Sequence, residues 1–133
     1  MANTIEGRGR EILEAANFAH VATKRDDGTV HGVVVWQDVE DDRLTLNTAE
    51  GRAWRKNVQR DPQVTITVAD AQNPYEYVEI RGRVVEDTHE GADEHIDALS
   101  KKYLGKDEYP FRQPGEQRVK IAVEPERVRF AGG

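Results

Sequence analysis

Short runs of alternating apolar and polar residues dominate the chain, and this period of two predicts β-strands. In residues 63–69, Val64, Ile66 and Val68 share one face of the predicted strand, and threonines occupy the other face. Similar runs elsewhere indicate further half-buried strands. The predicted strands cover residues 18–24, 29–39, 43–47, 63–69, 75–85, 118–123 and 127–130.

Turn residues separate these runs. Asp27-Gly28 between the first two predicted strands is typical of a hairpin, because both residues tolerate a positive φ. Further turns are expected at residues 40–42 and at Asn73-Pro74. Gly82 is expected to interrupt the long strand over residues 75–85.

Helical spacing appears in three short segments, namely residues 6–16, 52–60 and 92–105. Most of the predicted strands follow one another without a helix between them, whereas a doubly wound parallel sheet needs a helix after nearly every strand. The pattern therefore predicts a mainly β protein, an antiparallel barrel or sandwich, in one domain over residues 1–133.

Composition narrows the functional classes. The net charge of −6 argues against a general nucleic-acid binder, and the absence of cysteine excludes disulfides and thiolate metal sites. No apolar run is long enough to span a bilayer, and the N-terminus lacks the layout of a signal peptide. We therefore expect a cytoplasmic protein without a membrane partner.

Residues 51–60 stand out, because they hold four basic side chains and no acidic one. A helical wheel places Ala53, Trp54 and Val58 on a face that can pack on the barrel. The opposite face is polar and carries the positive charge; it consists of Arg52, Arg55, Lys56, Gln59 and Arg60.

Cations at a helix start oppose the helix dipole, and a bound anion would remove the conflict. Gly51 just before the helix permits close approach of a ligand to the backbone. Three interpretations remain open for this segment: a solvated face balanced by Glu50, a site for phosphate or another small anion, and a nucleic-acid surface.

Other candidate chemistry is sparse. The four histidines match no common metal spacing, and Ser100 is the only serine, so we predict neither a metal site nor a catalytic triad. Trp36 follows an apolar stretch, residues 33–35, that resembles a strand buried on both sides. Trp36, Tyr75 and Tyr77 fit either a barrel core or dimer interface, or a wall against a planar ring.

Taken together, the segments resemble the pyridoxamine-phosphate-oxidase-like family of flavin and deazaflavin oxidoreductases, especially its small members that use the deazaflavin coenzyme F420. The resemblance spans nearly the whole chain and rests on the order and spacing of its blocks. These blocks are residues 19–23, 35–39, 46–52, 57–62, 73–84 and 109–119.

The resemblance implies a split β-barrel of the FMN-binding type, forming a homodimer with cofactor bound at the subunit interface. Carried over by position, Arg52 and Lys56, helped by Arg55 after Gly51, would hold the cofactor phosphate. The remaining cofactor contacts would come from Val35, Trp36, Gln37, Asn47, Thr48, Ala49, Tyr75 and Tyr77. The two tyrosines would either reach the cofactor from the partner chain or line the substrate pocket.

The resemblance further implies hydride transfer from reduced F420 to a small conjugated or electrophilic acceptor. The cofactor supplies the chemistry, and no catalytic side chain is identified. Several deazaflavin-dependent relatives carry lysine where this chain has Trp54, and Arg55 could supply that charge instead. The alternatives are an FMN-binding pyridoxamine-phosphate-oxidase-like protein and a carrier of cofactor or haem without turnover.

Overall fold

The computed structural model describes residues 4–132, and its framework is one seven-stranded sheet in the order β2-β1-β5-β6-β7-β4-β3. Every neighbouring pair is antiparallel. The strands are β1 Ala19–Lys24, β2 Val30–Val35, β3 Gln37–Glu40, β4 Arg43–Ala49, β5 Gln63–Asp70, β6 Asn73–Thr88 and β7 Arg118–Ala131. The helices are α1 Gly7–Glu14, α2 Ala53–Arg60 and α3 Ala92–Leu104.

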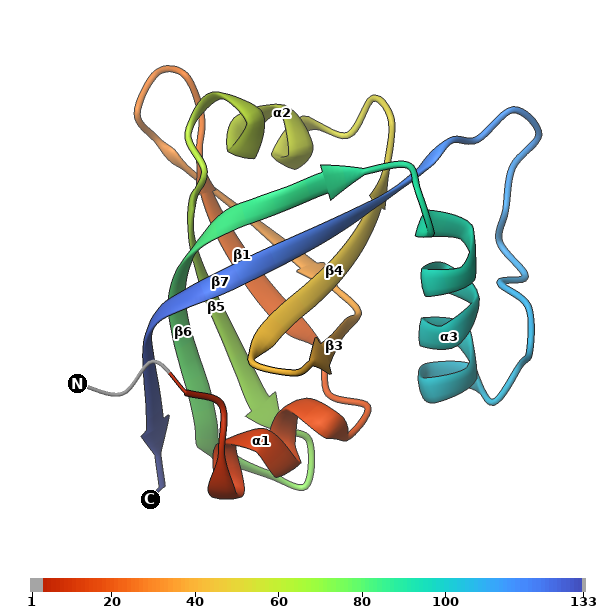
Figure 1. Cartoon of the computed structure of the whole chain (residues 1–133). Coiled ribbons are helices and arrows are strands. Elements are labelled where there is room, and N and C mark those ends of the chain that lie inside the picture. The colour runs from red at the N-terminus through yellow and green to blue at the C-terminus, as the bar shows by residue number, and fades with distance from the viewer. Residues whose placement is uncertain (1–3, 133) are drawn as a thin grey trace.

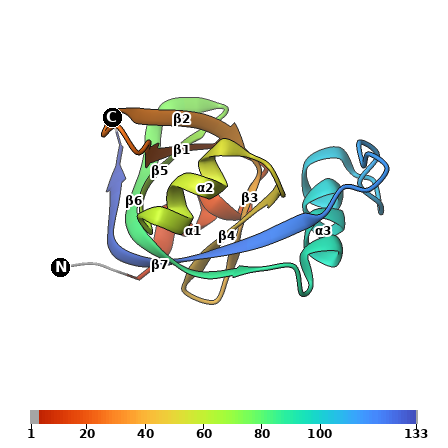
Figure 2. The same cartoon turned by 90° about the horizontal axis from the view of Figure 1, so that it is seen from above.

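The sheet curls into a partly open barrel, with α1 and α2 at opposite ends (Figure 1). Seen from above, α2 lies across the opening that the strands surround, while α3 stands outside the barrel (Figure 2). Apolar side chains from the strands meet Ile12 and Leu13 of α1 and Trp54 and Val58 of α2 in one buried core. The predicted mainly β antiparallel fold is confirmed.

The predicted strand over residues 29–39 is wrong in one respect, because it divides at Trp36 into β2 and β3. These two strands are consecutive in the chain but form opposite edges of the sheet. The backbone N–H of Gln37 donates to the hydroxyl of Tyr103 at 3.0 Å, and its carbonyl accepts from Nζ of Lys102 at 2.8 Å. Contacts from α3 therefore satisfy backbone groups of Gln37 at this break, while Gln37 also pairs with Leu46 of β4.

The expectation that residues 33–35 are buried on both sides is also wrong. β2 is an edge strand, and Val30 and Val34 on its outer face are 63% and 59% exposed. The run of valines carries no periodicity, so its sequence could not distinguish a central strand from an edge strand with an exposed apolar face.

Several boundaries differ from the predictions. Thr48 and Ala49 lie beyond the predicted strand over residues 43–47, but they belong to β4, where they pair with β7. Asn73-Pro74 begins β6, and the turn precedes it at residues 71–72. The two predicted C-terminal strands are one strand, β7, which continues through Pro125.

The predicted interruption at Gly82 is confirmed, since the register of β6 and β7 shifts between Arg81 and Gly82. A Cβ atom at Gly82 would lie 2.6 Å from the backbone oxygen of Glu124. Only glycine lets the two backbones approach this closely.

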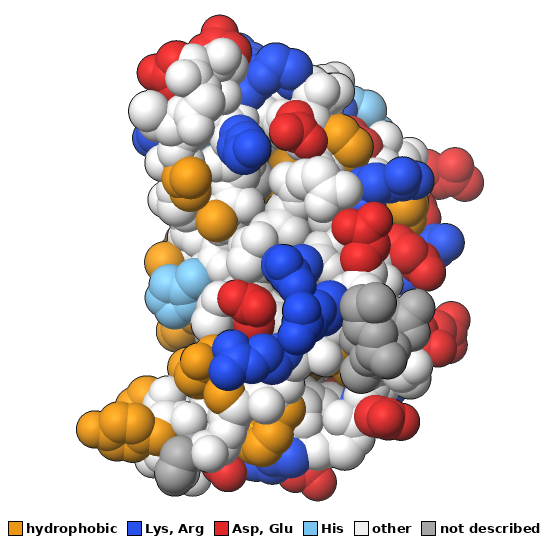
Figure 3. Space-filling model, turned by 90° about the vertical axis from the view of Figure 1, so that its left-hand side faces the viewer, with side chains coloured by type: hydrophobic (Ala, Val, Ile, Leu, Met, Phe, Trp, Pro, Cys, Tyr) orange, Lys and Arg blue, Asp and Glu red, His pale blue; other side chains and the backbone are white. Residues whose placement is uncertain are grey.

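Arginines are frequent on the outer face where β6 and β7 pair. Arg81 and Arg127 lie directly opposite each other, and Arg83 and Arg129 are also exposed. Figure 3 looks at the side of the molecule on which these strands run, and Lys and Arg side chains gather near the middle of that view. Of the helices described over residues 4–132, none is long and apolar enough to cross a membrane.

Candidate functional site

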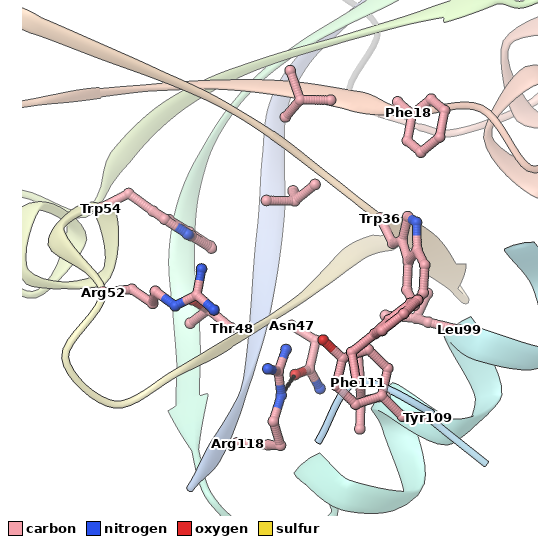
Figure 4. A pocket seen from close by; sticks show the side chains of 13 residues that line it. Phe18, Trp36, Asn47, Thr48, Arg52, Trp54, Leu99, Tyr109, Phe111 and Arg118 are labelled. Atoms are coloured by element: carbon pink, nitrogen blue, oxygen red, sulfur yellow. Dashed lines mark hydrogen bonds between the residues drawn. The ribbon is translucent and has the colours of Figure 1, made fainter. Parts of the chain in front are cut away.

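A cavity of about 260 Å³ lies where β2, β4, α2 and α3 approach the loop before β7 (Figure 4). Its wall is apolar and aromatic on one side and polar on the other. The lining residues are Phe18, Val34, Val35, Trp36, Asn47, Thr48, Arg52, Trp54, Ile96, Leu99, Tyr109, Phe111 and Arg118.

Arg52 brings positive charge to the cavity from the start of α2. It is the N-cap residue of α2, and no side chain caps the helix. Gly51 before it has φ 91°, a left-handed conformation that favours glycine in the turn between β4 and α2. The Arg52 side chain is exposed and forms no hydrogen bond or ion pair with any other residue between 4 and 132. Its charge therefore remains available to a ligand.

Asn47 fixes the polar side of the cavity. Its Nδ2 donates to the backbone oxygen of Ala92 and to Nδ1 of His95, each at 3.0 Å. Its Oδ1 accepts from Nε of Arg118 at 2.9 Å. Since all three contacts are used, the amide has one orientation, and β4, α3 and β7 are joined at one point.

His95 is neutral in this network. The Asn47 amide nitrogen only donates, so Nδ1 of His95 must accept and the ring proton lies on Nε2, which donates to Oγ1 of Thr45 at 3.0 Å. Burial, and next the positive charge of Lys120, lowers the pKa of His95 to about 4. The ring is therefore an uncharged support beneath Asn47.

Aromatic side chains form the opposite wall. Trp36 stacks on Tyr103 of α3 with 5.1 Å between ring centroids and 12° between planes, and it meets the edge of Tyr109 at 6.0 Å. Tyr109 in turn meets the edge of Phe111 at 5.8 Å. Burial raises the pKa of Tyr103 to about 12, so its hydroxyl stays protonated. The break at Trp36 thus supplies a rigid wall suited to a planar ring.

Of the residues predicted to bind cofactor, the structure brings five together in this cavity: Val35, Trp36, Asn47, Thr48 and Arg52. The other lining residues were not among those predicted to bind cofactor. Tyr109, Phe111 and Arg118 fall within a block that the resemblance covered, so the aromatic content of that loop was a usable signal.

Gln37 does not line the cavity, and its predicted place along the ring edge needs correction. Its side chain is fully buried and donates to the backbone oxygens of Leu13 and Asn17 at 2.9 and 3.2 Å. Gln37 begins β3 just after the break at Trp36, and its side chain packs between α1 and the segment before β1 instead of facing the cavity. Ala49 is also buried, and its carbonyl accepts from the backbone N–H of Arg52.

The structure does not support the predicted role of Arg55 in binding the cofactor phosphate. Its guanidinium pairs with Glu50 at 2.7 Å and with Asp87 at 2.8 Å, and hydrogen bonding to Asp87 raises its pKa. Two carboxylates therefore already neutralise this cation. It cannot replace a lysine at the position of Trp54, whose indole is buried and borders the cavity.

Lys56 is exposed beside a separate depression between α2 and the β1–β2 hairpin. It does not line the cavity that Arg52 borders, so the predicted joint contact of Arg52 and Lys56 with one phosphate stays a prediction. Ala53, expected on the packed face, is exposed, and Asn57 is buried in its place, donating to Oγ1 of Thr23 at 3.0 Å.

Tyr75 and Tyr77 do not line the cavity of their own chain. They lie near the start of β6, where Tyr77 pairs with Ala131 at the end of β7 and Tyr75 is 76% exposed. Contact with a partner's cavity stays a prediction. Within residues 4–132, no group of His, Asp and Glu is arranged to hold a metal ion.

Comparisons with known proteins agree with this architecture. The sequence profile of the pyridoxamine 5'-phosphate oxidase family matches residues 5–132. A solved F420 reductase is 27% identical with a TM-score of 0.82, and the match covers 94% of this chain and 98% of that one. No functionally curated protein matches the sequence.

Two further solved structures share the fold at lower identity. A putative pyridoxamine 5'-phosphate oxidase from Listeria innocua is 20% identical, with a TM-score of 0.70 and coverage of 92% and 94% of the two chains. A conserved hypothetical protein from Mycobacterium tuberculosis is 19% identical, with a TM-score of 0.73 and coverage of 99% and 88%. With its split β-barrel and the profile match over nearly its full length, this chain belongs to the pyridoxamine 5'-phosphate oxidase family of flavin-binding oxidoreductases.

Proposed function

We propose that the protein is an F420-dependent oxidoreductase that passes hydride from the reduced deazaflavin to a small conjugated or electrophilic acceptor. The observation that carries this proposal is the position of Arg52. An arginine without an ionic partner among residues 4–132 stands at the edge of a cavity whose other wall is aromatic. A ligand with a planar ring and a phosphate would match both features, with the ring against the aromatic wall and the phosphate beside Arg52.

The start of α2 fits the phosphate. The first turn of α2 contains no acidic residue, and no side chain satisfies its first backbone N–H groups. An anion there would accept hydrogen bonds from these N–H groups and from Arg52, and the positive end of the helix dipole would attract it. Lys56, four residues later, borders a separate depression and adds a second positive charge near the start of α2.

The cavity itself fits a ring rather than a whole cofactor. Its volume of about 260 Å³ is below the range of roughly 300–1,000 Å³ typical of sites that enclose a drug-sized ligand. The ring would lie against Trp36 and beneath the polar groups of Asn47 and Thr48. When bound, the cofactor would supply the hydride, while the protein would orient the ring and exclude water.

We propose that a second copy of the chain completes this site in a homodimer. Phe18 and Val34 line the cavity although they are 53% and 59% exposed, and Val34 belongs to an edge strand. Exposed apolar side chains on an unpaired strand edge favour association. Light scattering after size-exclusion chromatography should give twice the 15.0 kDa chain mass; a monomer that still binds cofactor would refute this part.

We favour F420 over FMN because a solved structure that is 27% identical to this chain is named an F420 reductase. Titration of the purified protein with F420 and FMN, followed by ring fluorescence, tests the choice. Micromolar F420 affinity with much weaker FMN affinity is the expected result. The opposite order would make the protein an FMN-binding member, and binding of neither would reject the proposal.

Variants that remove a positive charge test whether Arg52 binds the cofactor phosphate. Arg52→Ala should weaken F420 binding at least tenfold, about 1.4 kcal/mol, while the fold is retained. Arg43→Ala is a matched control, because Arg43 pairs with Glu124 outside the cavity. Equal affinities for both variants would assign Arg52 to a solvated surface. Consumption of reduced F420 with an electrophilic acceptor then separates a reductase from a carrier.

A further inference from the structure

The outer face of the sheet carries arginines to which neither the core nor the candidate site gives a role. The register of five neighbouring strands sets the side chains of this face in rows that run across β2, β1, β5, β6 and β7. One row consists of Val34, His20, Thr67, Glu79 and Arg129, and the next consists of Gly32, Ala22, Thr65, Arg81 and Arg127. The face therefore has small or apolar residues on β2 and arginines on β7.

These arginines lack anionic partners in their own chain. Arg81 and Arg127 lie directly opposite each other, and like charges in that position destabilise a strand pair. Arg129 lies opposite Glu79, but none of the three arginines forms an ion pair with a residue between 4 and 132. Lys and Arg side chains gather near the middle of this side of the molecule (Figure 3). At the other edge of the face, Val34 is 59% exposed. A partner that covers the face would relieve both the charge and the exposed apolar surface.

A second copy of the chain fits this face, and the arginines select its orientation. A two-fold dimer that packs sheet against sheet can have its axis across the strands or along them. With the axis across the strands, β7 would lie on β7 and arginines would oppose arginines, which is unfavourable. With the axis along β5, the central strand of the five, β7 of one copy would lie over β2 of the other.

Side-chain size agrees with the axis along β5. Sheets that pack face to face lie about 10 Å apart, so a long side chain requires open space opposite it. The partner's Arg127 would lie over Gly32, where an added Cβ would meet nothing within 4 Å. The partner's Arg81 would lie over Ala22, another small residue. The largest side chains of the row thus meet the smallest ones.

This arrangement brings a cation of the partner to the candidate site. Val34 lines the cavity, and the residue that would oppose it is the partner's Arg129. Arg52 lies elsewhere on the rim, beside Trp54 and apart from Phe18 (Figure 4). The two cations therefore stand at different edges of the cavity, and only Arg52 belongs to the helix start that fits a phosphate.

We propose that two copies associate through this face about a two-fold axis along β5, and that the partner's Arg129 binds a carboxylate of the acceptor. The inference rests on the proposed function and names its substrate class, planar conjugated acceptors that carry a negative group. Such an acceptor lies between the two copies, over the open face of the ring, and outside the cavity of about 260 Å³ that the ring would occupy. Arginine suits this role, because its planar guanidinium can form two parallel hydrogen bonds with a carboxylate.

Cross-linking tests the face and the axis. The chain has no cysteine, so a single introduced cysteine is its only thiol. Thr67 lies on β5, in the row of Val34, and should face its own copy across the axis. A short bis-maleimide should therefore convert Thr67→Cys, and not Val34→Cys, into a covalent dimer. Cross-linking of Val34→Cys, or of neither variant, would overturn the proposed arrangement.

Two probes of similar shape test the role of Arg129. Cinnamate and cinnamamide are both planar and conjugated, but only cinnamate is charged. The F420-loaded protein should bind cinnamate about tenfold more tightly by calorimetry, and Arg129→Gln should bind the two probes within about twofold of each other. Arg83→Gln is the matched control and should keep the preference, because Arg83 is exposed on the same face but lies beyond the row of Arg81. Equal or undetectable binding by the parent protein, or a preference that survives in Arg129→Gln, would refute the role.

Titration with F420 separates this inference from the proposed function. Arg129→Gln should bind F420 within about twofold of the parent protein, whereas Arg52→Ala should lose about tenfold. A loss of about tenfold in Arg129→Gln would mean that the partner's Arg129 holds the cofactor and not the acceptor. If the parent protein binds F420 without preferring cinnamate, only the role of Arg129 fails. If it binds no F420, the proposed function fails and the role of Arg129 with it, while the cross-linking result still decides the dimer face.

Discussion

Oδ1 of Asn47 accepts a hydrogen bond of 2.9 Å from Nε of Arg118, and this contact joins the end of β4 to the start of β7. The same side chain reaches α3 through Ala92 and His95. One amide therefore connects the three elements that form the polar side of the cavity. Because its partners include a buried guanidinium, its removal affects both stability and the placement of Arg118.

We expect Asn47→Leu to lower the free energy of unfolding by about 2–4 kcal/mol, because it leaves buried donors and acceptors unpaired. Urea unfolding followed by circular dichroism measures this loss. Gln59→Leu is the control, since Gln59 is exposed on α2. A loss below 1 kcal/mol at Asn47 would show that the network contributes little to the fold.

Stability should fall as the pH drops from about 6.5 towards about 4, partly through His95. The pKa of His95 is lowered in the folded protein, so the unfolded chain binds its proton first as pH falls, and stability is lost in that window. Over the whole window, protonation of His95 should lower the free energy of unfolding by about 3 kcal/mol. In His95→Gln, which cannot be protonated, the slope of unfolding free energy against pH should be shallower; parallel slopes would exclude His95 as a source.

The hydroxyl of Tyr103 holds the break between β2 and β3, since it accepts from the backbone N–H of Gln37 and donates to the carbonyl of Asn17. Tyr103→Phe should cost about 1–3 kcal/mol, because both backbone groups lose a partner. Tyr109→Phe is the matched control, since its ring contributes edge contacts that phenylalanine keeps. The comparison uses thermal unfolding, and equal losses would argue against a special role for Tyr103.

Gly82→Ala should be strongly destabilising, by about 2–4 kcal/mol, because the new Cβ would meet the backbone of β7. Gly32→Ala serves as its control in the same sheet, since a Cβ there meets nothing within 4 Å. Chemical denaturation of both variants gives the difference. Similar stabilities would mean that β7 can shift away from β6 without cost.

Much of the fold follows from local pattern. The alternation of Val64, Ile66 and Val68 determined β5, and helical spacing up to Gly105 determined α3, because each signal lies within one element. The order of the seven strands does not follow from local pattern, because β2 and β3 are consecutive in sequence but lie at opposite edges of the sheet. At the junction between them, Gln37 contacts Lys102 and Tyr103, which are distant in sequence.

The basic segment over residues 51–60 shows the same division within the candidate site. Its sequence determined a short helix with a cationic start, because composition and period act over neighbouring residues. Only the tertiary structure decided which cation remains available: Glu50 and Asp87 neutralise Arg55, whereas Arg52 borders the cavity. Charge pairing depends on distances between folded segments, and those distances are set when the barrel closes and not by the order of residues.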